Sequence, residues 1–167
     1  NNNKEGFIET KGNFTIMTGI DIFDDIYSNI YDSLVFNNEK NKFEVQIINN
    51  NIFPNDKNKI LDIGCSTGHR VNKLSNGNNY VIGIDNSPAM IKKSRENYPE
   101  NNFKMCDEIN GMEFNYESFT HISCLYFTIY YIKNKKIFLD NCYNWLKPGG
   151  LFILHLVDMH NFDPVMP

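Results

Sequence analysis

We predict an α/β fold with a doubly wound, mostly parallel sheet, from three observations along the chain. Short apolar runs alternate with amphipathic stretches, and the connections between them are short. The run at 119–125 contains no Asp, Glu, Lys or Arg, and we interpret it as a strand covered on both faces. The chain has 167 residues, enough for one domain with a real core. We therefore expect three layers, with a ligand site at the carboxyl ends of the strands.

Each element is predicted from its own pattern. Apolar residues recur at helical spacing through Phe23, Tyr27 and Ile30, which predicts a helix over 20–30. A second amphipathic repeat predicts a helix over 43–52 that ends before Pro54. Further strands are expected at 59–63, 80–84, 102–106, 119–125 and 151–157, and further helices at 69–75 (closed by Gly77), from Ser87-Pro88 through 93, and at 135–146.

The domain organisation is predicted as one domain with two additions at its start. Residues 1–14 are expected to be a flexible lead-in, 15–58 an N-terminal helical segment that acts as a lid, and 59–167 the core. The chain begins at Asn1 rather than Met and ends shortly after the last strand, so we expect an excerpt of a longer polypeptide.

The most informative stretch is 60–69. It predicts a buried strand that breaks at Gly64 into a tight loop and then opens a helix. Such a loop gathers backbone amides at one point and suits a polar, nucleotide-like ligand. The next strand ends at Asp85, about twenty residues later, the spacing at which an acidic side chain can bind the two hydroxyls of a ribose.

These segments resemble the class I S-adenosylmethionine-dependent methyltransferases. The run 62–68 is similar to their motif I, and 83–90 is similar to the segment that follows it. The run 105–107 falls where the family has a residue near the adenine amino group, and 146–150, leading into 151–154, matches the turn before the fifth strand. The resemblance implies a Rossmann-like fold, S-adenosylmethionine as cofactor, S-adenosylhomocysteine as product, and methyl transfer.

The resemblance also implies roles for individual residues. Asp62 would support the amino group of the cofactor, Asp85 would bind the ribose, and Met90 would lie against the adenine. Tyr27 and Tyr31 are similar to a lid element of many small-molecule methyltransferases. The expected cofactor-binding residues are Asp62, Gly64, Cys65, Ser66, Gly68, Asp85, Asn86, Met90, Cys106, Asp107, Glu108, Leu125, Tyr126, Tyr27 and Tyr31.

The family's sheet normally ends with an antiparallel strand pair that covers the fifth strand. Nothing after Val157 predicts such a pair, so the C-terminal strands are expected to be missing. An open apolar edge promotes aggregation. We therefore expect another segment or subunit to cover this edge.

The acceptor is less well defined. The stretch after the fourth strand, 125–131, lacks the Asn/Asp-Pro-Pro-Tyr/Phe signature with which family members hold a planar amide or amine. This argues against adenine-N6, cytosine-N4 and glutamine-amide acceptors. Tyr126 and Tyr130 are the candidate pocket residues, and we name no catalytic base because the sulfonium leaves readily. His121 is expected to be structural, while His155 and His160 are weaker pocket candidates.

Composition limits the remaining possibilities. The net charge is −4 and the pI is near 5.5, so the sequence does not indicate the positively charged surface with which proteins bind nucleic acid. Four cysteines without metal-site spacing favour a reduced, cytoplasmic protein, and we expect no metal and no membrane segment. A small-molecule acceptor is favoured. The alternatives are a nicotinamide-dependent oxidoreductase, a non-catalytic regulatory subunit with a methyltransferase-like fold, and a nucleic-acid methyltransferase domain of a larger protein.

Overall fold

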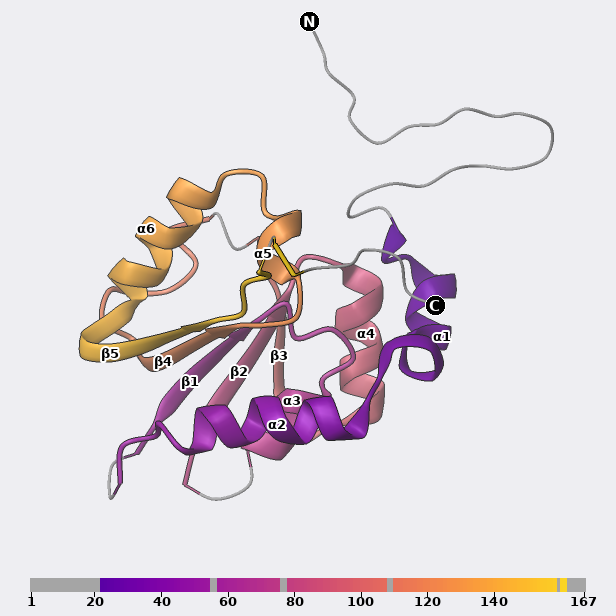
Figure 1. Ribbon diagram of the computed structural model, residues 1–167, viewed down its shortest axis with the longest axis horizontal. Helices are drawn as coiled ribbons and strands as arrows, with labels where there is room; N and C mark the ends of the chain where they lie inside the picture. The colour runs from indigo at the N-terminus through magenta and orange to yellow at the C-terminus, as the bar shows by residue number, and fades with distance from the viewer. Residues whose placement is uncertain (1–21, 55–56, 76–77, 108–109, 159, 162–167) are drawn as a thin grey trace, which may run out of the picture.

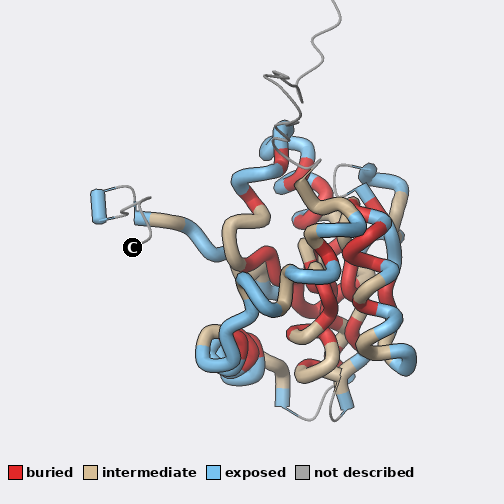
Figure 2. The backbone as a smooth tube through the Cα atoms, turned by 90° about the vertical axis from the view of Figure 1, so that its right-hand side faces the viewer, coloured by how far each residue is buried: buried red, intermediate tan, exposed pale blue. Residues whose placement is uncertain are grey.

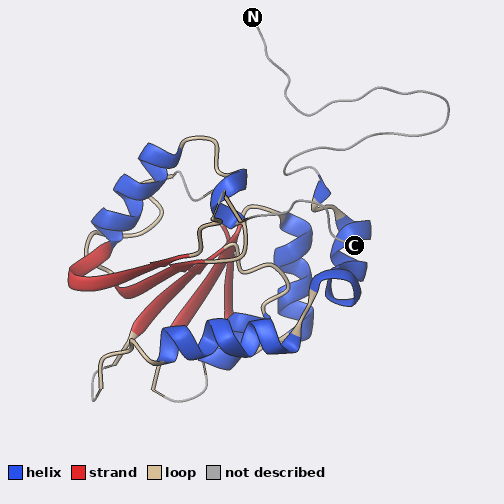
Figure 3. Ribbon diagram, in the orientation of Figure 1, coloured by secondary structure: helices blue, strands red, loops and turns tan. Residues whose placement is uncertain are grey.

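A computed structural model describes residues 22–54, 57–75, 78–107, 110–158 and 160–161. Five parallel strands form one sheet in the order β3-β2-β1-β4-β5, flanked by helices (Figures 1 and 3). The strands are β1 (Lys59–Ile63), β2 (Tyr80–Asp85), β3 (Asn102–Met105), β4 (Phe119–Cys124) and β5 (Leu146–Leu154). This architecture confirms the predicted doubly wound, Rossmann-like class.

The strand order reverses beside β1, which places a ligand crevice there. β1 pairs with β2 on one side and with β4 on the other, with Ile63 opposite both Ile84 and Cys124. Every residue of β4 is buried, as predicted for a strand covered on both faces, and three of them are the polar residues Thr120, His121 and Ser123. The loops that follow β1 and β4 therefore leave the sheet at adjacent positions along one edge.

Helices cover both faces of the sheet and complete the three layers. The helices are α1 (Asp25–Val35), α2 (Asn38–Asn49), α3 (His69–Leu74), α4 (Pro88–Asn97), α5 (Thr128–Tyr131) and α6 (Lys135–Trp145). One buried cluster joins the sheet to α2, α3 and α4 through Ile48, Val71 and Ile91. The other joins it to α5 and α6 through Ile129 and Phe138. Figure 2 shows this buried material running through the centre of the molecule.

The first predicted helix was placed too early. α1 begins at Asp25 because the Asp24 side chain caps it, accepting a hydrogen bond of 2.7 Å from the Tyr27 amide. It continues to Val35 rather than ending at 30. Ile26 is 74% exposed, so the face of α1 that points inward is not the aliphatic face that the spacing suggested.

The second helix also starts earlier than predicted. Asn37 caps α2, so the helix begins at Asn38 instead of 43 and ends at Asn49 instead of 52. Its buried side carries two polar residues, Asn41 and Glu44, beside Val45 and Ile48. Because the prediction followed apolar spacing alone, it missed the polar first half.

The last strand differs most from its prediction. β5 begins at Leu146, which pairs with Phe119, and ends at Leu154 rather than 157. The expected turn at 146–150 lies inside these bounds, where the register between β4 and β5 shifts. The short helix α5 was not predicted, and α4 runs on to Asn97.

Some predictions are not addressed by the described residues. The lead-in at 1–14, Gly77 and Glu108 lie outside them. β5 stands at the end of the strand order, and the segment expected to cover its edge stays a prediction. Of the helices within the described ranges, none has the length and apolarity needed to cross a bilayer.

Candidate functional site

A cavity of about 380 Å³ lies at the carboxyl ends of the strands, between the loop after β1 and the helices α1 and α2. Its size is within the range of small-molecule sites, roughly 300–1,000 Å³. Most of the predicted cofactor residues line it, namely Tyr27, Tyr31, Gly64, Cys65, Ser66, Asp85, Asn86, Met90, Leu125 and Tyr126. Residues far apart in the sequence therefore meet at this edge of the sheet.

The loop after β1 has a backbone that requires glycine. Gly64 has a φ of +69°, and a Cβ built there would lie 2.3 Å from the Thr128 hydroxyl oxygen at the start of α5. Gly68 has a φ of +90°, and its Cβ would meet the ring of Phe103 at 2.7 Å. Gly64 thus lets the loop approach α5 at the cavity wall. Gly68 instead allows the loop to pack on β3 and does not line the cavity.

Asp85 is held at the cavity wall by backbone amides. Its Oδ2 accepts a hydrogen bond of 3.0 Å from the Ser66 amide, and its Oδ1 accepts one of 2.9 Å from the Ser87 amide. Burial raises the pKa of Asp85, and these amide hydrogen bonds oppose that rise. A carboxylate has about four acceptor positions, so Asp85 can still accept a hydroxyl hydrogen from a ligand besides its bonds to the amides of Ser66, Ser87 and Asn86.

Asp62, in contrast, lies behind the cavity wall. It is fully buried, and its Oδ1 accepts hydrogen bonds from Arg70 Nε at 2.8 Å and Ser123 Oγ at 2.7 Å. Arg70 also donates from Nη1 to Glu44 Oε2 at 2.8 Å. Burial alone would lower the pKa of Arg70, but the two carboxylates outweigh it and raise that pKa. Arg70 therefore stands between the motif I aspartate and helix α2.

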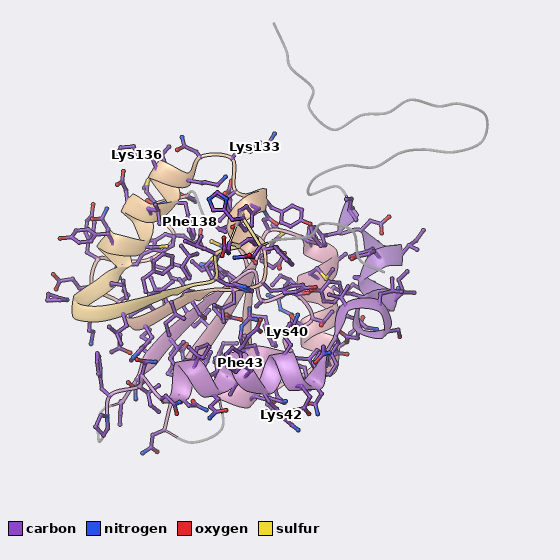
Figure 4. All side chains as sticks on the ribbon, viewed as in Figure 1. Lys40, Lys42, Phe43, Lys133, Lys136 and Phe138 are labelled. Atoms are coloured by element: carbon purple, nitrogen blue, oxygen red, sulfur yellow. The ribbon has the colours of Figure 1, made fainter. Side chains whose placement is uncertain are left out.

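Three cavity residues on α2 were missed by sequence reasoning: Lys40, Asn41 and Glu44. Lys40 Nζ lies 3.1 Å from the ring centroid of Tyr126, and burial lowers the pKa of Lys40 while Glu44 opposes this. Figure 4 shows Lys40 on the sheet side of α2 and Lys42 on the outer side. The available signal was that Asn41 and Glu44 share a helical face with Val45 and Ile48.

Aromatic side chains form the opposite wall of the cavity. The rings of Phe23 and Tyr27 lie 5.7 Å apart, those of Tyr27 and Tyr31 5.7 Å, and those of Phe23 and Tyr131 5.3 Å. Burial, partly opposed by a hydrogen bond with Ser66, raises the pKa of Tyr31 to about 12. Tyr130, predicted as a pocket residue, is instead 48% exposed and accepts a hydrogen bond from the Val157 amide. Its neighbour Tyr131 lines the cavity.

The remaining predicted residues lie elsewhere. Cys106 is in the core and Asp107 is exposed after β3, and neither lines the cavity. His121 is buried, with Nδ1 2.9 Å from Thr120 Oγ1 and Nε2 2.9 Å from the Asn51 carbonyl, which fits its predicted structural role. His155 is exposed and stacks on Phe127, while the unpredicted His69 lines the cavity.

The cavity suits the polar and charged parts of S-adenosylmethionine. Asp85 offers carboxylate acceptors, and Met90 and Leu125 offer apolar surface. Glu44 Oε1 and Asn41 Oδ1 are buried acceptors without a hydrogen-bond partner among the described residues. A ligand that carries hydroxyl and ammonium donors beside an aromatic base would satisfy these groups.

The comparison with known families identifies the chain. The methyltransferase domain family matches residues 61–154, which include most of β1, the loop after it, Asp85 and all of β5. The chain belongs to this family, the class I S-adenosylmethionine-dependent methyltransferases. The match covers the cavity loop and runs to the end of the last strand. Membership in this family argues against the alternative of a nicotinamide-dependent oxidoreductase.

Individual relatives agree with this membership. Carboxy-S-adenosyl-L-methionine synthase of Nautilia profundicola is 30% identical over 138 residues, which are 80% of this chain and 56% of that protein. The TehB-like S-adenosylmethionine-dependent methyltransferase of Corynebacterium glutamicum has the same fold, with a TM-score of 0.66 and 20% identity over 78% of this chain and 73% of the other.

A third comparison is with a structure that holds the cofactor. Phosphoethanolamine N-methyltransferase 2 of Haemonchus contortus, in complex with S-adenosyl-L-methionine, has a TM-score of 0.66 and 23% identity over 80% of this chain and 33% of the other. The present chain spans 36–60% of the length of eight curated relatives.

Proposed function

We propose that this chain transfers the methyl group of S-adenosylmethionine to a small-molecule acceptor. The observation that carries the proposal is the cavity between α1, α2 and the sheet edge. Asp85, the loop after β1 and the tyrosines of α1 line it together. A roof formed by α1 and α2 favours a small acceptor over a macromolecule. The net charge of −4 points the same way, since nucleic-acid enzymes carry basic surfaces.

Within the proposal, the residues act mainly by position. S-adenosylmethionine supplies an activated methyl on a sulfonium that is a good leaving group. Asp85 would hold the ribose hydroxyls and Met90 would contact the adenine. The aromatic wall from Tyr27 to Tyr131 would exclude water and orient the acceptor. Such positioning needs no dedicated base when the acceptor atom is already nucleophilic at neutral pH.

Thermal unfolding with S-adenosylmethionine and S-adenosylhomocysteine tests cofactor binding. A ligand at a hundred times its dissociation constant stabilises the native state by about 2.7 kcal/mol, which raises the Tm by several degrees. We expect this shift in the parent and in Asp140→Ala, whose carboxylate is exposed on α6. The shift should be lost in Asp85→Ala. A folded parent with no shift would contradict the proposal and favour the non-catalytic subunit.

The acceptor class is tested with the methyl-tritiated cofactor. Incubation with the small-molecule fraction of a cell extract should label low-mass products, whereas label in purified RNA or DNA would favour a nucleic-acid methyltransferase. Several curated relatives are named carboxy-S-adenosyl-L-methionine synthases, which makes modification of the cofactor itself a second candidate. Mass spectrometry distinguishes the two, because methyl transfer yields S-adenosylhomocysteine and carboxylation adds a carboxyl group to the cofactor.

A further inference from the structure

Two polar side chains of α2 are buried at the cavity. Asn41 and Glu44 are 5% and 6% exposed, and both line the cavity. They are three residues apart, so they lie on one face of the helix. Burying a polar atom without a hydrogen bond is costly, which makes unpaired atoms at a cavity wall a sign of a ligand contact.

Glu44 uses only one of its oxygens within the protein. Oε2 accepts from Arg70 Nη1 at 2.8 Å, and Arg70 is anchored in turn to Asp62 at 2.8 Å. Oε1 has no hydrogen-bond partner among the described residues, and neither has Asn41 Oδ1. Arg70 therefore holds the Glu44 carboxylate in place, while Oε1 is a buried acceptor without a partner among the described residues, on a residue that lines the cavity.

The surrounding charges define what these oxygens can bind. Asp62, Glu44 and Asp85 carry three negative charges against the two positive charges of Arg70 and Lys40, so these groups in and behind the cavity wall have a net charge of −1. Lys40, the next cation on α2, lies over the ring of Tyr126. Two acceptor oxygens in a negatively charged setting suit a donor that is itself a cation, and they would repel a carboxylate or phosphate.

We propose that Glu44 and Asn41 form a subsite for a protonated primary amine. The inference rests on the proposed function, and the amine has two sources with the same chemistry: the amino group of the cofactor's methionine part, or an amine on the acceptor. Asp62 Oδ2 also has no hydrogen-bond partner among the described residues, but Asp62 does not line the cavity, so in either case the amine is bound from α2 rather than by the motif I aspartate.

Calorimetric titration of matched variants tests the subsite. In Glu44→Gln the amide oxygen can still accept from Arg70, but an NH₂ group then faces the cavity in place of an oxygen. Asn41→Leu removes the second acceptor at similar volume. Glu39→Gln, an exposed residue of the same helix, is the control for loss of one charge. Cooperative thermal unfolding of each variant establishes that it is folded.

Four probes separate the sources of the amine. They are S-adenosylhomocysteine, its analogue without the amino group, 5′-methylthioadenosine, and ethylamine added to the protein saturated with S-adenosylhomocysteine. If the amine is the cofactor's, the parent binds S-adenosylhomocysteine at least tenfold more tightly than the analogue. This difference is lost in Glu44→Gln and reduced in Asn41→Leu, while binding of 5′-methylthioadenosine stays within twofold.

If the amine belongs to the acceptor, S-adenosylhomocysteine and the analogue bind alike, and ethylamine binds the saturated parent at least tenfold more tightly than the saturated Glu44→Gln variant. The subsite is overturned if the parent shows no preference for either amine, or if the preference is unchanged in both variants. Failure of the proposed function gives a different result, since then neither S-adenosylhomocysteine nor 5′-methylthioadenosine binds the folded parent.

Discussion

Asp32 of α1 accepts a hydrogen bond of 2.6 Å from the hydroxyl of Thr67, a residue of the loop after β1. The other oxygen of Asp32 approaches His69 Nε2 at 3.0 Å, without hydrogen-bond geometry. The His69 ring stacks on Phe36 at 4.0 Å, just after α1. These contacts hold α1 and the residue after it against the loop that forms the cavity wall.

Replacement of Asp32 should therefore weaken the attachment of α1 to the loop after β1. We expect Asp32→Ala to lower the free energy of unfolding by about 1.5–3 kcal/mol, because a hydrogen bond to a charged acceptor is lost. We also expect it to weaken S-adenosylhomocysteine binding several-fold. Urea denaturation and calorimetric titration measure the two effects. Asp140→Ala, which breaks an exposed pair on α6, should change stability by only a few tenths of a kcal/mol. Equal effects for the two variants would contradict the role of Asp32.

Gly64 and Gly149, two of the described glycines with positive φ, allow a matched test of close packing. Both backbones are left-handed, with φ of +69° and +78°, but a Cβ at Gly149 meets no heavy atom within 4 Å. Gly149→Ala should cost about 1–2 kcal/mol from backbone conformation alone. Gly64→Ala should cost more, because its Cβ would displace Thr128, and it should also weaken cofactor binding. If urea denaturation gave equal losses of unfolding free energy for the two variants, Thr128 and α5 would be able to move away from the new Cβ without a loss of stability.

Removing Arg70 should be among the most damaging single changes. Arg70→Met would leave the carboxylates of Asp62 and Glu44 buried without their cation, and breaking a buried ion pair in this way costs about 3–5 kcal/mol. Lys73→Met on the same helix removes a cation whose partner, Asn38, is exposed, so its cost should be small. Chemical denaturation of both variants gives the comparison, and similar midpoints would argue against a structural role for the buried pair.

Tyr31 should contribute to unfolding at alkaline pH. Its pKa is about 12 in the folded protein against 10.0 for the unperturbed group, mainly because of burial. Between these values the unfolded state releases the phenolic proton and the folded state keeps it. The resulting stability is fully present below pH 10 and is lost as pH rises toward 12, by roughly 1.4 kcal/mol per pH unit.

The measurement is the free energy of unfolding as a function of pH between 9 and 12. The slope should be shallower in Tyr31→Phe than in the parent. Tyr143→Phe is the control, since Tyr143 is 81% exposed on α6, and it should follow the parent. If the parent and Tyr31→Phe have the same slope, the phenol of Tyr31 ionises as easily in the folded state as in the unfolded state.

Local sequence was sufficient for the central strands and the loop between them. The bounds of β1 were predicted as observed, and β2 extends by the single residue Asp85. A buried parallel strand is a continuous apolar run with clear ends, and Gly64 is required by its own backbone angle. Such features depend on neighbours in the chain, which is why a single sequence reveals them.

The placement of α1 and α2 over the cavity and the side chains around Asp62 could not be predicted from local sequence. The Arg70–Glu44 ion pair joins residues 26 positions apart, and the bond between Asp32 and Thr67 joins residues 35 apart. The pattern of α2 places Glu44 on the same face as Val45 and Ile48, but its ion-pair partner Arg70 belongs to α3, which packs beside α2. Local periodicity and the backbone angles that glycine allows were enough to predict the fold class and the cofactor loop. The tertiary structure decided which charges meet inside the cavity, because that depends on side chains brought together from separate elements.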